Sequence, residues 1–554
     1  MIRIFHIFIC FLISPNLFGQ LQEYNNGVIS TANILASEAG IDIMKKGGNA
    51  IDAAVGAGFV LAVVYPQAGN IGGGGFMIIH LQKGLNTSID YREKAPLNAH
   101  RNMYLNSDGN VVENLSTTGN LAAGVPGSVA GMLYALEKYG TKSREEILEY
   151  AYNIADTGFY VNSQLANDLN AYRKEFINFP ETMKVFGNIQ REGDLLIQKD
   201  LAATLKEIIL NGIKGFYEGK TADLIVNEMN NSGGIISYED LKLYVPKERE
   251  VINGNYRGYE IISMGPPSSG GISLIYLLNI LENYDLKKHG YGSSENIQLM
   301  TEAMRRVYAD RSEFMGDADF VNVPADILTS KVYAERRMSD YSEFKSTPSV
   351  NVNPGEAYYR ESDQTTHYSV ADGKGNIVSV TTTINDVFGN KVVVRDAGFF
   401  LNNEMDDFVS KPGVPNLYGL VGNEANSIEP GKRMLSSMTP VIVFKDNKPF
   451  LAAGSPGGGR IITTVLQTIV NIIDYNMNLN NAINSPRFHH QWYPDEIQSE
   501  KNLIDDNSKL KLSGMGYQIK EMRDFGKVDA VIFNENGSMS GHTDRRGSGY
   551  VSGF

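Results

Sequence analysis

Two adjacent threonines, Thr365 and Thr366, stand where the chain could carry a nucleophile that its own cleavage exposes. They follow the polar, proline- and glycine-containing run 347–361, which is typical of a mobile linker, and they open a strand-like segment. A threonine hydroxyl is weakly nucleophilic and needs an adjacent base. After a cut before Thr365, the new α-amine, with an ordinary pKa of about 7.7–8.0, could act as that base. On these residues alone, an ordinary edge strand is the competing interpretation.

The residues that follow predict a β-hairpin with a second hydroxyl opposite the first. Two strand-like segments, 367–371 and 377–385, flank a cluster of turn residues. A hairpin that turns at Lys374 places Thr365 opposite Thr383. The other side chains should divide between a polar face and an apolar face, with His367 and Ser369 on the first and Tyr368, Val370, Val378 and Val380 on the second.

Several long segments occur in a fixed order along the chain. They are LASEAGIDIMKKGGNAIDAA near residue 40, GNIGGGGFM near residue 72, DQTTHYSV at 363–370, LNNEMDDF at 401–408, PGVPNLYGLVG at 412–422, LSSMTP at 435–440, GSPGGGR at 454–460 and PRFHHQW at 486–492. Together they closely resemble γ-glutamyltransferase, also called γ-glutamyl transpeptidase, of the N-terminal-nucleophile hydrolase superfamily. The resemblance implies an α+β fold, a four-layer αββα sandwich of the N-terminal-nucleophile hydrolase type.

The resemblance also implies which residues perform the chemistry. Thr365 matches the family nucleophile, which forms a γ-glutamyl ester while its own α-amine moves the proton. Thr383 matches the residue that hydrogen-bonds this nucleophile. Gly457 and Gly458 match the oxyanion hole, where glycine lets backbone N–H groups approach a developing negative charge. Without that context, the glycine-rich segment would be interpreted as a tight turn.

A γ-glutamyl group carries an α-carboxylate and an α-ammonium group, so its site needs a cation and several acceptors. The resemblance assigns these contacts: Arg92, Ser436 and Ser437 to the carboxylate, Asn385, Glu404 and Asp407 to the ammonium group, and Tyr418 to a lid loop at 412–422. The planar fork of an arginine suits a carboxylate because it can bind both oxygens. The alternatives are loop or cap serines and a solvated acidic loop. Asp406 is not expected to face the ligand.

By resemblance, the donor is glutathione or another γ-glutamyl compound, and the acceptor is water, an amino acid or a peptide. The precursor is expected to cut itself between Gln364 and Thr365, leaving a large subunit of about 20–364 and a small one of 365–554 in one intertwined domain. No metal or organic cofactor is implied. The alternatives are a related glutaryl- or cephalosporin-type acylase and a non-catalytic ligand-binding relative. A glutaryl group has no ammonium for Glu404 and Asp407, which argues against the acylase.

Helices are expected to hold much of the chain, with two in 31–64 and others at 128–139, 272–281 and 461–475. Ser37 is expected to cap the first of them and Asn49 the second. The Arg- and Asp-rich helix at 303–312 is interpreted as one held by salt bridges rather than as part of a site. Three histidines, His367, His489 and His490, are expected to be structural, because adjacent side chains of a strand point apart and no metal-binding motif occurs.

Composition and the N-terminal residues limit the partners and the cellular location expected for the protein. The net charge of −13 argues against a nucleic-acid partner. Residues 1–19 have a basic start and a short apolar run, as in a signal peptide, which predicts a periplasmic or secreted protein. An uncleaved anchor is the alternative. The only cysteine, Cys10, lies in this segment, which excludes structural disulfides from the mature chain. No later apolar run reaches the roughly 18 residues of a membrane span.

Overall fold

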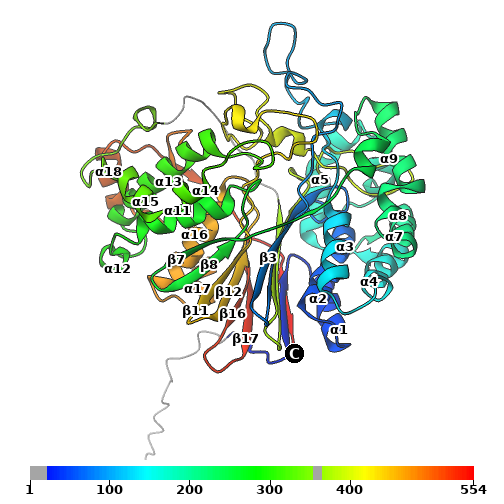
Figure 1. Ribbon diagram of the computed structural model, residues 1–554, viewed down its shortest axis with the longest axis horizontal. Coiled ribbons are helices and arrows are strands. Elements are labelled where there is room, and N and C mark those ends of the chain that lie inside the picture. The colour runs from blue at the N-terminus through cyan, green and yellow to red at the C-terminus, as the bar shows by residue number, and fades with distance from the viewer. Residues whose placement is uncertain (1–20, 354–364) are drawn as a thin grey trace, which may run out of the picture.

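Two β-sheets lie face to face, and helices cover the outer face of each (Figure 1). The computed structural model describes residues 21–353 and 365–554. The seven-stranded sheet has the order β18 (Tyr550–Gly553), β1 (Gly27–Thr31), β9 (Thr366–Asp372), β10 (Ile377–Thr383), β2 (Gly74–Leu81), β3 (Leu85–Asp90), β6 (Lys247–Arg249). The six-stranded sheet has the order β17 (Met539–Thr543), β16 (Asp529–Phe533), β12 (Lys448–Gly454), β11 (Val441–Lys445), β8 (Tyr259–Ser263), β7 (Ile252–Tyr256). The predicted α+β sandwich of four layers is confirmed.

The helices divide between the two outer layers (Figure 1). The layer on the seven-stranded sheet contains α1 (Ile34–Lys45), α2 (Ala50–Val64), α3 (Ser128–Tyr139), α4 (Arg144–Thr157), α5 (Ser163–Phe176), α6 (Pro180–Phe186), α7 (Lys199–Asn211), α8 (Lys214–Tyr217), α9 (Gly219–Ser232) and α10 (Tyr238–Lys242). The layer on the six-stranded sheet contains α11 (Gly270–Leu281), α12 (Leu286–His289), α13 (Ser294–Phe314), α14 (Ala325–Leu328), α15 (Lys331–Arg337), α16 (Arg460–Ile473), α17 (Leu479–Asn484) and α18 (Asp506–Gly514). Two small sheets, β13 (Phe488–His489) with β14 (Ile497–Glu500) and β15 (Ile519–Met522), and β4 (Phe159–Tyr160) with β5 (Leu195–Leu196), lie outside the sandwich.

The central hairpin has the predicted register. Ala371 pairs with Ile377 at the turn, and Thr366 pairs with Thr382 at the open end. One further step along both strands brings Thr365 opposite Thr383. The turn is closed by Asp372, whose carboxylate accepts the N–H groups of Lys374 and Asn376 at 2.9 and 3.0 Å. An Asp at this place satisfies the exposed backbone donors of a tight turn.

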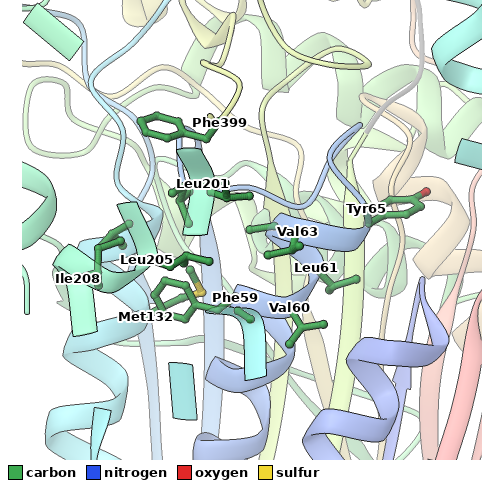
Figure 2. Close-up of a cluster of buried hydrophobic side chains, with 14 of the residues drawn as sticks. Phe59, Val60, Leu61, Val63, Tyr65, Met132, Leu201, Leu205, Ile208 and Phe399 are labelled. Carbon is green, nitrogen blue, oxygen red and sulfur yellow. The ribbon is translucent and has the colours of Figure 1, made fainter. Parts of the chain in front are cut away.

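The two faces of this hairpin are also as predicted. The apolar side chains Tyr368, Val370, Val378 and Val380 belong to the hydrophobic core under the helical layer. Figure 2 shows side chains of α2 and α7 in the same core, among them Phe59, Val63, Leu201 and Leu205. Helix α2 approaches the sheet closely, because a Cβ on Gly58 would lie 2.6 Å from the Tyr368 hydroxyl. On the polar face, the Ser369 hydroxyl donates to the carbonyl of Asp529 in the second sheet at 3.3 Å. The hairpin therefore presents its polar side to the space between the sheets.

Capping residues in the sequence predicted the start of α2 correctly and the start of α1 wrongly. Asn49 caps α2 as predicted, with a capping box to Asp52. The cap of α1 is Asn33, so the prediction of Ser37 was wrong. The helix begins one turn earlier, and the Ser37 hydroxyl donates to the carbonyl of Tyr550 at 2.8 Å. The Ser37 hydroxyl is therefore bound to the C-terminal strand β18 and does not cap a helix.

Several predictions fall on residues outside the described ranges: the leader at 1–19, the linker from 354 onward, and Gln364. The described beginning of that linker is held in place, since the Ser349 hydroxyl donates to the carbonyl of Trp492 at 2.6 Å. Among the helices of 21–353 and 365–554, none is both long and apolar enough to cross a membrane.

Candidate active site

One small cavity between the two sheets gathers the predicted site residues. Ten of the eleven that the structure describes line it. Thr383 is the last residue of β10, and the others lie outside the strands of the two sheets: Arg92, Thr365, Asn385, Glu404, Asp407, Tyr418, Ser436, Ser437 and Gly458. The eleventh, Gly457, is adjacent in the chain to Gly458 and does not line the cavity. The cavity holds about 20 Å³, space for roughly one water molecule.

The two threonines occupy the open end of the hairpin. Thr365 directly precedes β9 and is 6% exposed, and Thr383 ends β10. The Thr383 Oγ1 accepts the backbone N–H of Asn385 at 2.7 Å. A hydroxyl has two acceptor positions and one proton to donate. With one acceptor position occupied by Asn385, Thr383 can still donate its proton to a neighbouring oxygen in the cavity.

Asn385 is held in an unusual backbone conformation beside these threonines. Its φ is +73°, in the left-handed region that asparagine tolerates better than most residues. Its side-chain Nδ2 donates to the carbonyl of Asn403 at 3.0 Å. Its own carbonyl accepts the Tyr418 hydroxyl. Asn385 therefore connects the nucleophile strand, the acidic loop and the lid.

The glycine turn before α16 has the properties of an anion site. Gly457 and Gly458 have φ values of +134° and +51°, which are strained for residues with a Cβ. Within the described residues, the N–H groups of Gly457 and Gly458 donate no hydrogen bond. Helix α16 starts two residues later, and its N-terminal end carries partial positive charge. The turn can therefore stabilise a developing oxyanion.

Arg92 forms the centre of a buried ion cluster. Its guanidinium lies 2.6 Å from Glu404, 2.5 Å from Asp407 and 3.5 Å from Glu93. Burial raises the pKa of all three carboxyl groups, that of Glu93 to about 8, and the attraction of Arg92 opposes the rise. The residues predicted to bind opposite ends of an amino acid thus contact each other directly. Glu93, which the sequence interpretation did not single out, belongs to the same cluster.

The two serines of the LSSMTP segment lie beside this cluster, and Ser437 contacts α13. The Ser437 Oγ accepts a hydrogen bond from Arg311 Nη2 at 2.9 Å, and the Ser436 Oγ accepts the N–H of Met438 at 3.1 Å. The interpretation of α13 as a purely salt-bridged helix was therefore incomplete. Arg305 and Arg306 do lie close to Glu302, at 3.6 and 2.6 Å. Arg311 instead brings a second guanidinium to the edge of the cavity.

A sequence signal could have distinguished Arg311 from the other arginines of its helix. The positions three and four residues away are Val307, Tyr308, Phe314 and Met315, none of them acidic. An arginine without a carboxylate at these spacings lacks the usual partner on its own helix. Such a residue is a candidate for a contact outside the helix.

The predicted lid loop lies over the cavity. Tyr418 is 3% exposed, and its ring fills the space above the glycine turn, since a Cβ on Gly458 would lie 2.7 Å from it. The loop is bound to the acidic segment η3 (Glu404–Asp407), because Asp406 accepts the N–H of Leu417 at 2.6 Å. As expected, Asp406 does not line the cavity.

The three histidines make structural contacts. His367 lies 2.9 Å from the Thr381 hydroxyl, and His489 lies 2.8 Å from the Thr463 hydroxyl. Burial lowers the pKa of His367 to about 3 and that of His490 to about 4, so both are neutral near pH 7. Over the described ranges, no group of three or more His, Cys, Asp or Glu side chains could hold a metal ion.

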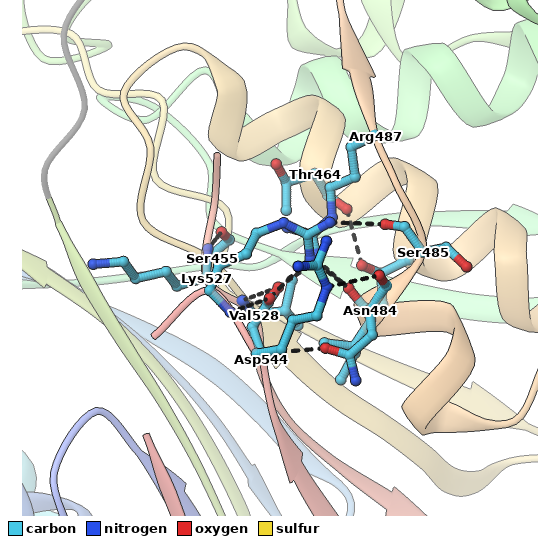
Figure 3. A network of polar contacts seen from close by, with 12 residues as sticks. Ser455, Thr464, Asn484, Ser485, Arg487, Lys527, Val528 and Asp544 are labelled. Carbon is cyan, nitrogen blue, oxygen red and sulfur yellow. Dashed lines mark hydrogen bonds and ion pairs between the residues drawn. The ribbon is translucent and has the colours of Figure 1, made fainter. Parts of the chain in front are cut away.

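Figure 3 shows a polar network around Arg487, Asp544 and Lys527, which reaches Ser455 just before the glycine turn. Arg487, from the PRFHHQW segment, contacts Asp544 at 2.5 Å and the carbonyl of Phe525 at 3.0 Å. The neighbouring Lys527 N–H donates to the Ser455 hydroxyl at 3.0 Å. Ser455 lies two residues before Gly457 in the chain. The network thereby helps to hold the turn through which Gly458 lines the cavity.

Comparisons with known proteins find relatives that match this chain over most of its length. The sequence profile described as gamma-glutamyltranspeptidase matches residues 36–554. The chain is 48% identical over 524 residues to a glutathione hydrolase proenzyme of Escherichia coli strain K12, covering 94% of this chain and 90% of that protein. It is 52% identical to the crystal structure of Helicobacter pylori gamma-glutamyltranspeptidase, with a TM-score of 0.58 over 58% of this chain and 94% of that one. A cephalosporin acylase from Bacillus halodurans, with a TM-score of 0.84, 24% identity and coverage of 98% and 99%, shares the fold.

Proposed function

Because the chain belongs to the γ-glutamyltranspeptidase family, we propose that it is a self-cleaving glutathione hydrolase and γ-glutamyltransferase. It takes the γ-glutamyl group from glutathione or another γ-glutamyl compound and transfers it to water, an amino acid or a peptide. The observation that carries the proposal is one cavity that Thr365 lines together with Gly458 of the glycine turn and with a buried cluster of Arg92 and acidic residues. An acyl-transfer site for an amino acid needs these three parts together.

Each step of the reaction has a group to perform it. The Thr365 hydroxyl attacks the γ-carbonyl carbon, and its α-amine accepts the hydroxyl proton. The N–H groups of Gly457 and Gly458 stabilise the negative oxygen of the tetrahedral intermediate. When the C–N bond breaks, the α-amine returns the proton to the leaving nitrogen, and a γ-glutamyl ester of Thr365 remains. Water or an acceptor amine then attacks the ester and restores the hydroxyl.

The donor's charged groups explain the ion cluster. The α-carboxylate is assigned to Arg92 with Ser436 and Ser437, and the α-ammonium group to Glu404 and Asp407. In the closed cavity Arg92 already contacts both carboxylates at 2.6 and 2.5 Å. When a zwitterionic donor replaces these contacts, its α-carboxylate binds Arg92 and its α-ammonium group binds Glu404 and Asp407. Every buried charge then keeps a partner of opposite sign. An uncharged acyl group offers no such exchange.

Maturation uses the same hydroxyl. Attack of Thr365 on the carbonyl of Gln364 gives an ester that water opens, leaving a large subunit of about 20–364 and a small subunit of 365–554. The central sheet contains strands from both: β1, β2, β3 and β6 from the first, and β9, β10 and β18 from the second. Both subunits therefore belong to one folded unit after cleavage. Residues 1–19 support export of the precursor to the periplasm or the exterior.

The competing function is a glutaryl- or cephalosporin-type acylase on the same fold. The two carboxylates of Glu404 and Asp407 at the cavity favour a donor with an ammonium group, since a glutaryl chain offers them no cation. A non-catalytic relative is the other candidate, and it requires that Thr365 is never released.

A denaturing gel with N-terminal sequencing tests the proposal. Two chains are expected, the smaller beginning at Thr365, and the mature protein should release glutamate from glutathione. The Thr365→Ala variant should remain a single chain without activity. A native protein that stays uncut yet releases glutamate at full rate would refute the N-terminal-nucleophile mechanism.

A further inference from the structure

The lid loop at 412–422 is tied to the two consecutive carboxylates of η3, and only one of them lines the cavity. We propose that Asn416 is a positioning residue that links closure of the lid to recognition of the donor's α-ammonium group by Asp407. This inference rests on the proposed function and adds to it a residue that determines specificity from outside the cavity.

Asn416 shapes the lid and tethers it at the same time. Its Oδ1 accepts the backbone N–H groups of Tyr418 and Leu420 at 3.0 and 3.1 Å, which folds the loop around it. Its Nδ2 donates to the Oδ1 of Asp407 at 2.9 Å. One side chain therefore connects the position of Tyr418, which covers the cavity, to the carboxylate assigned to the donor's ammonium group.

A second tether holds the next residue of the loop. The N–H of Leu417 donates to Asp406 at 2.6 Å, and the other oxygen of Asp406 accepts the Ser116 hydroxyl at 2.6 Å. Beyond the loop, the Asn426 side chain donates to the Asp407 carbonyl at 2.6 Å. The lid is thus bound to η3 at two points, and the chain beyond it at a third. Of these, only the bond from Asn416 reaches a side chain that lines the cavity.

The coupling follows from what Asp407 must do when a donor binds. Its Oδ2 contacts Arg92 and its Oδ1 contacts Asn416. A carboxylate has about four acceptor positions, so Asp407 can accept an ammonium group without releasing Asn416. The Tyr418 ring covers the glycine turn, so a γ-glutamyl group that reaches this turn displaces the lid. The lid then closes again when Asn416 donates to Asp407, the residue that binds the ammonium group.

The decisive variant is Asn416→Asp. It keeps the oxygen that accepts the N–H groups of Tyr418 and Leu420, and it replaces only the amide that donates to Asp407. Two carboxylates then face each other across a contact of 2.9 Å, which repels the lid. Asn423→Asp is the matched control, since Asn423 Nδ2 donates to Glu313 at 2.7 Å and its Oδ1 accepts the Glu424 N–H at 3.0 Å. It makes the same change at the end of the loop, away from the cavity.

Amide hydrogen exchange of the lid segment, together with kcat and KM for glutathione, provides the readout. In the native enzyme, L-glutamate should slow exchange at 417–420 about tenfold or more, the effect of one charge-assisted hydrogen bond. Glutarate, which lacks the ammonium group, should not. Asn416→Asp should exchange faster without any ligand, should lose the effect of glutamate, and should raise KM more than it lowers kcat. Asn423→Asp should resemble the native enzyme.

Exchanging the side chains of Asp407 and Asn416 shows whether the effect of Asn416→Asp comes from loss of the hydrogen bond between them or from general unfolding of the loop. The double variant Asp407→Asn with Asn416→Asp again places an amide opposite a carboxylate, so slow exchange of the lid should return in the absence of ligand. Native exchange and native KM in Asn416→Asp would overturn the inference, as would failure of the swap to restore slow exchange. A native protein that never releases glutamate from glutathione would instead refute the proposed function, and the ligand-free exchange would still decide whether the tether exists.

Discussion

Replacing Thr383 by valine or by serine separates the effect of its hydroxyl on the stability of the fold from its effect on maturation and kcat. Thr383→Val keeps the branched shape and removes the oxygen, whereas Thr383→Ser keeps the oxygen and removes one methyl group. The structure gives this oxygen two tasks: it lies opposite Thr365, and it accepts the Asn385 N–H at 2.7 Å. The hairpin register alone suggests that valine would scarcely affect folding, but the bond to Asn385 changes that expectation.

The magnitudes follow from burial. Thr383 is 3% exposed, so valine leaves the Asn385 N–H without an acceptor, at a cost of about 1–3 kcal/mol of unfolding free energy. Serine loses about 0.8 kcal/mol for its methyl group, and it keeps the bond to Asn385 and a hydroxyl proton that can be donated to Thr365. Loss of the bond that orients the nucleophile should slow maturation and lower kcat about tenfold or more, equivalent to roughly 1.4 kcal/mol. Valine should therefore affect both stability and rate, and serine mainly stability.

Two assays measure these effects separately. Disappearance of the precursor on denaturing gels gives the maturation rate, and glutamate release gives kcat for whatever matures. Urea unfolding is best measured in the Thr365→Ala background, where every molecule remains one chain. Equal maturation rates and equal kcat values for the valine and serine variants would show that the Thr383 hydroxyl plays no part in orienting Thr365.

Three further predictions test other parts of the site and the core. Asp407→Asn should lower kcat/KM for γ-glutamyl donors about tenfold or more, and for a glutaryl amide much less, because only the first carries an ammonium group; equal losses would make Asp407 structural. Gly458→Ala should reduce kcat about a hundredfold, since its Cβ would lie 2.7 Å from the Tyr418 ring and disturb an oxyanion donor; a native kcat would exclude Gly458 from that role. Burial raises the pKa of Asp529 to about 8, so the folded protein keeps a proton that the unfolded chain loses above about pH 4. The free energy of unfolding should therefore decrease as the pH rises from about 4 to 8, and Asp529→Asn, measured by urea unfolding at pH 5 and pH 8, should flatten this decrease.

The sequence predicted the hairpin register because its signals are local. A turn cluster and an alternation of apolar and polar residues within twenty positions suffice to fix which side chains share a face. The start of α1 is different. Ser37 has the type of a capping residue, yet its hydroxyl bonds to Tyr550, more than 500 positions away, and no local pattern reports such a contact.

The arrangement of the site illustrates the same limit. The resemblance supplied the residues that line the cavity, but not that Arg92 would contact Glu404 and Asp407 directly. These contacts depend on how β3 and η3, some 310 positions apart, meet at the end of the sandwich. Arg311 was missed for the same reason, since its partner Ser437 lies on another element. Chemistry that depends on long-range contacts requires the structure.

Strand β1 is hydrogen-bonded on one side to β18 and on the other to β9. Under the proposed cleavage, both neighbours belong to the small subunit and β1 to the large one. Before the cut, folding is a reaction within one chain and its yield does not depend on concentration. After the cut, recovery from the unfolded state requires two chains to meet, so it becomes dependent on protein concentration. The uncut Thr365→Ala protein should regain its structure from urea at any dilution, whereas the mature enzyme should do so less completely the more it is diluted.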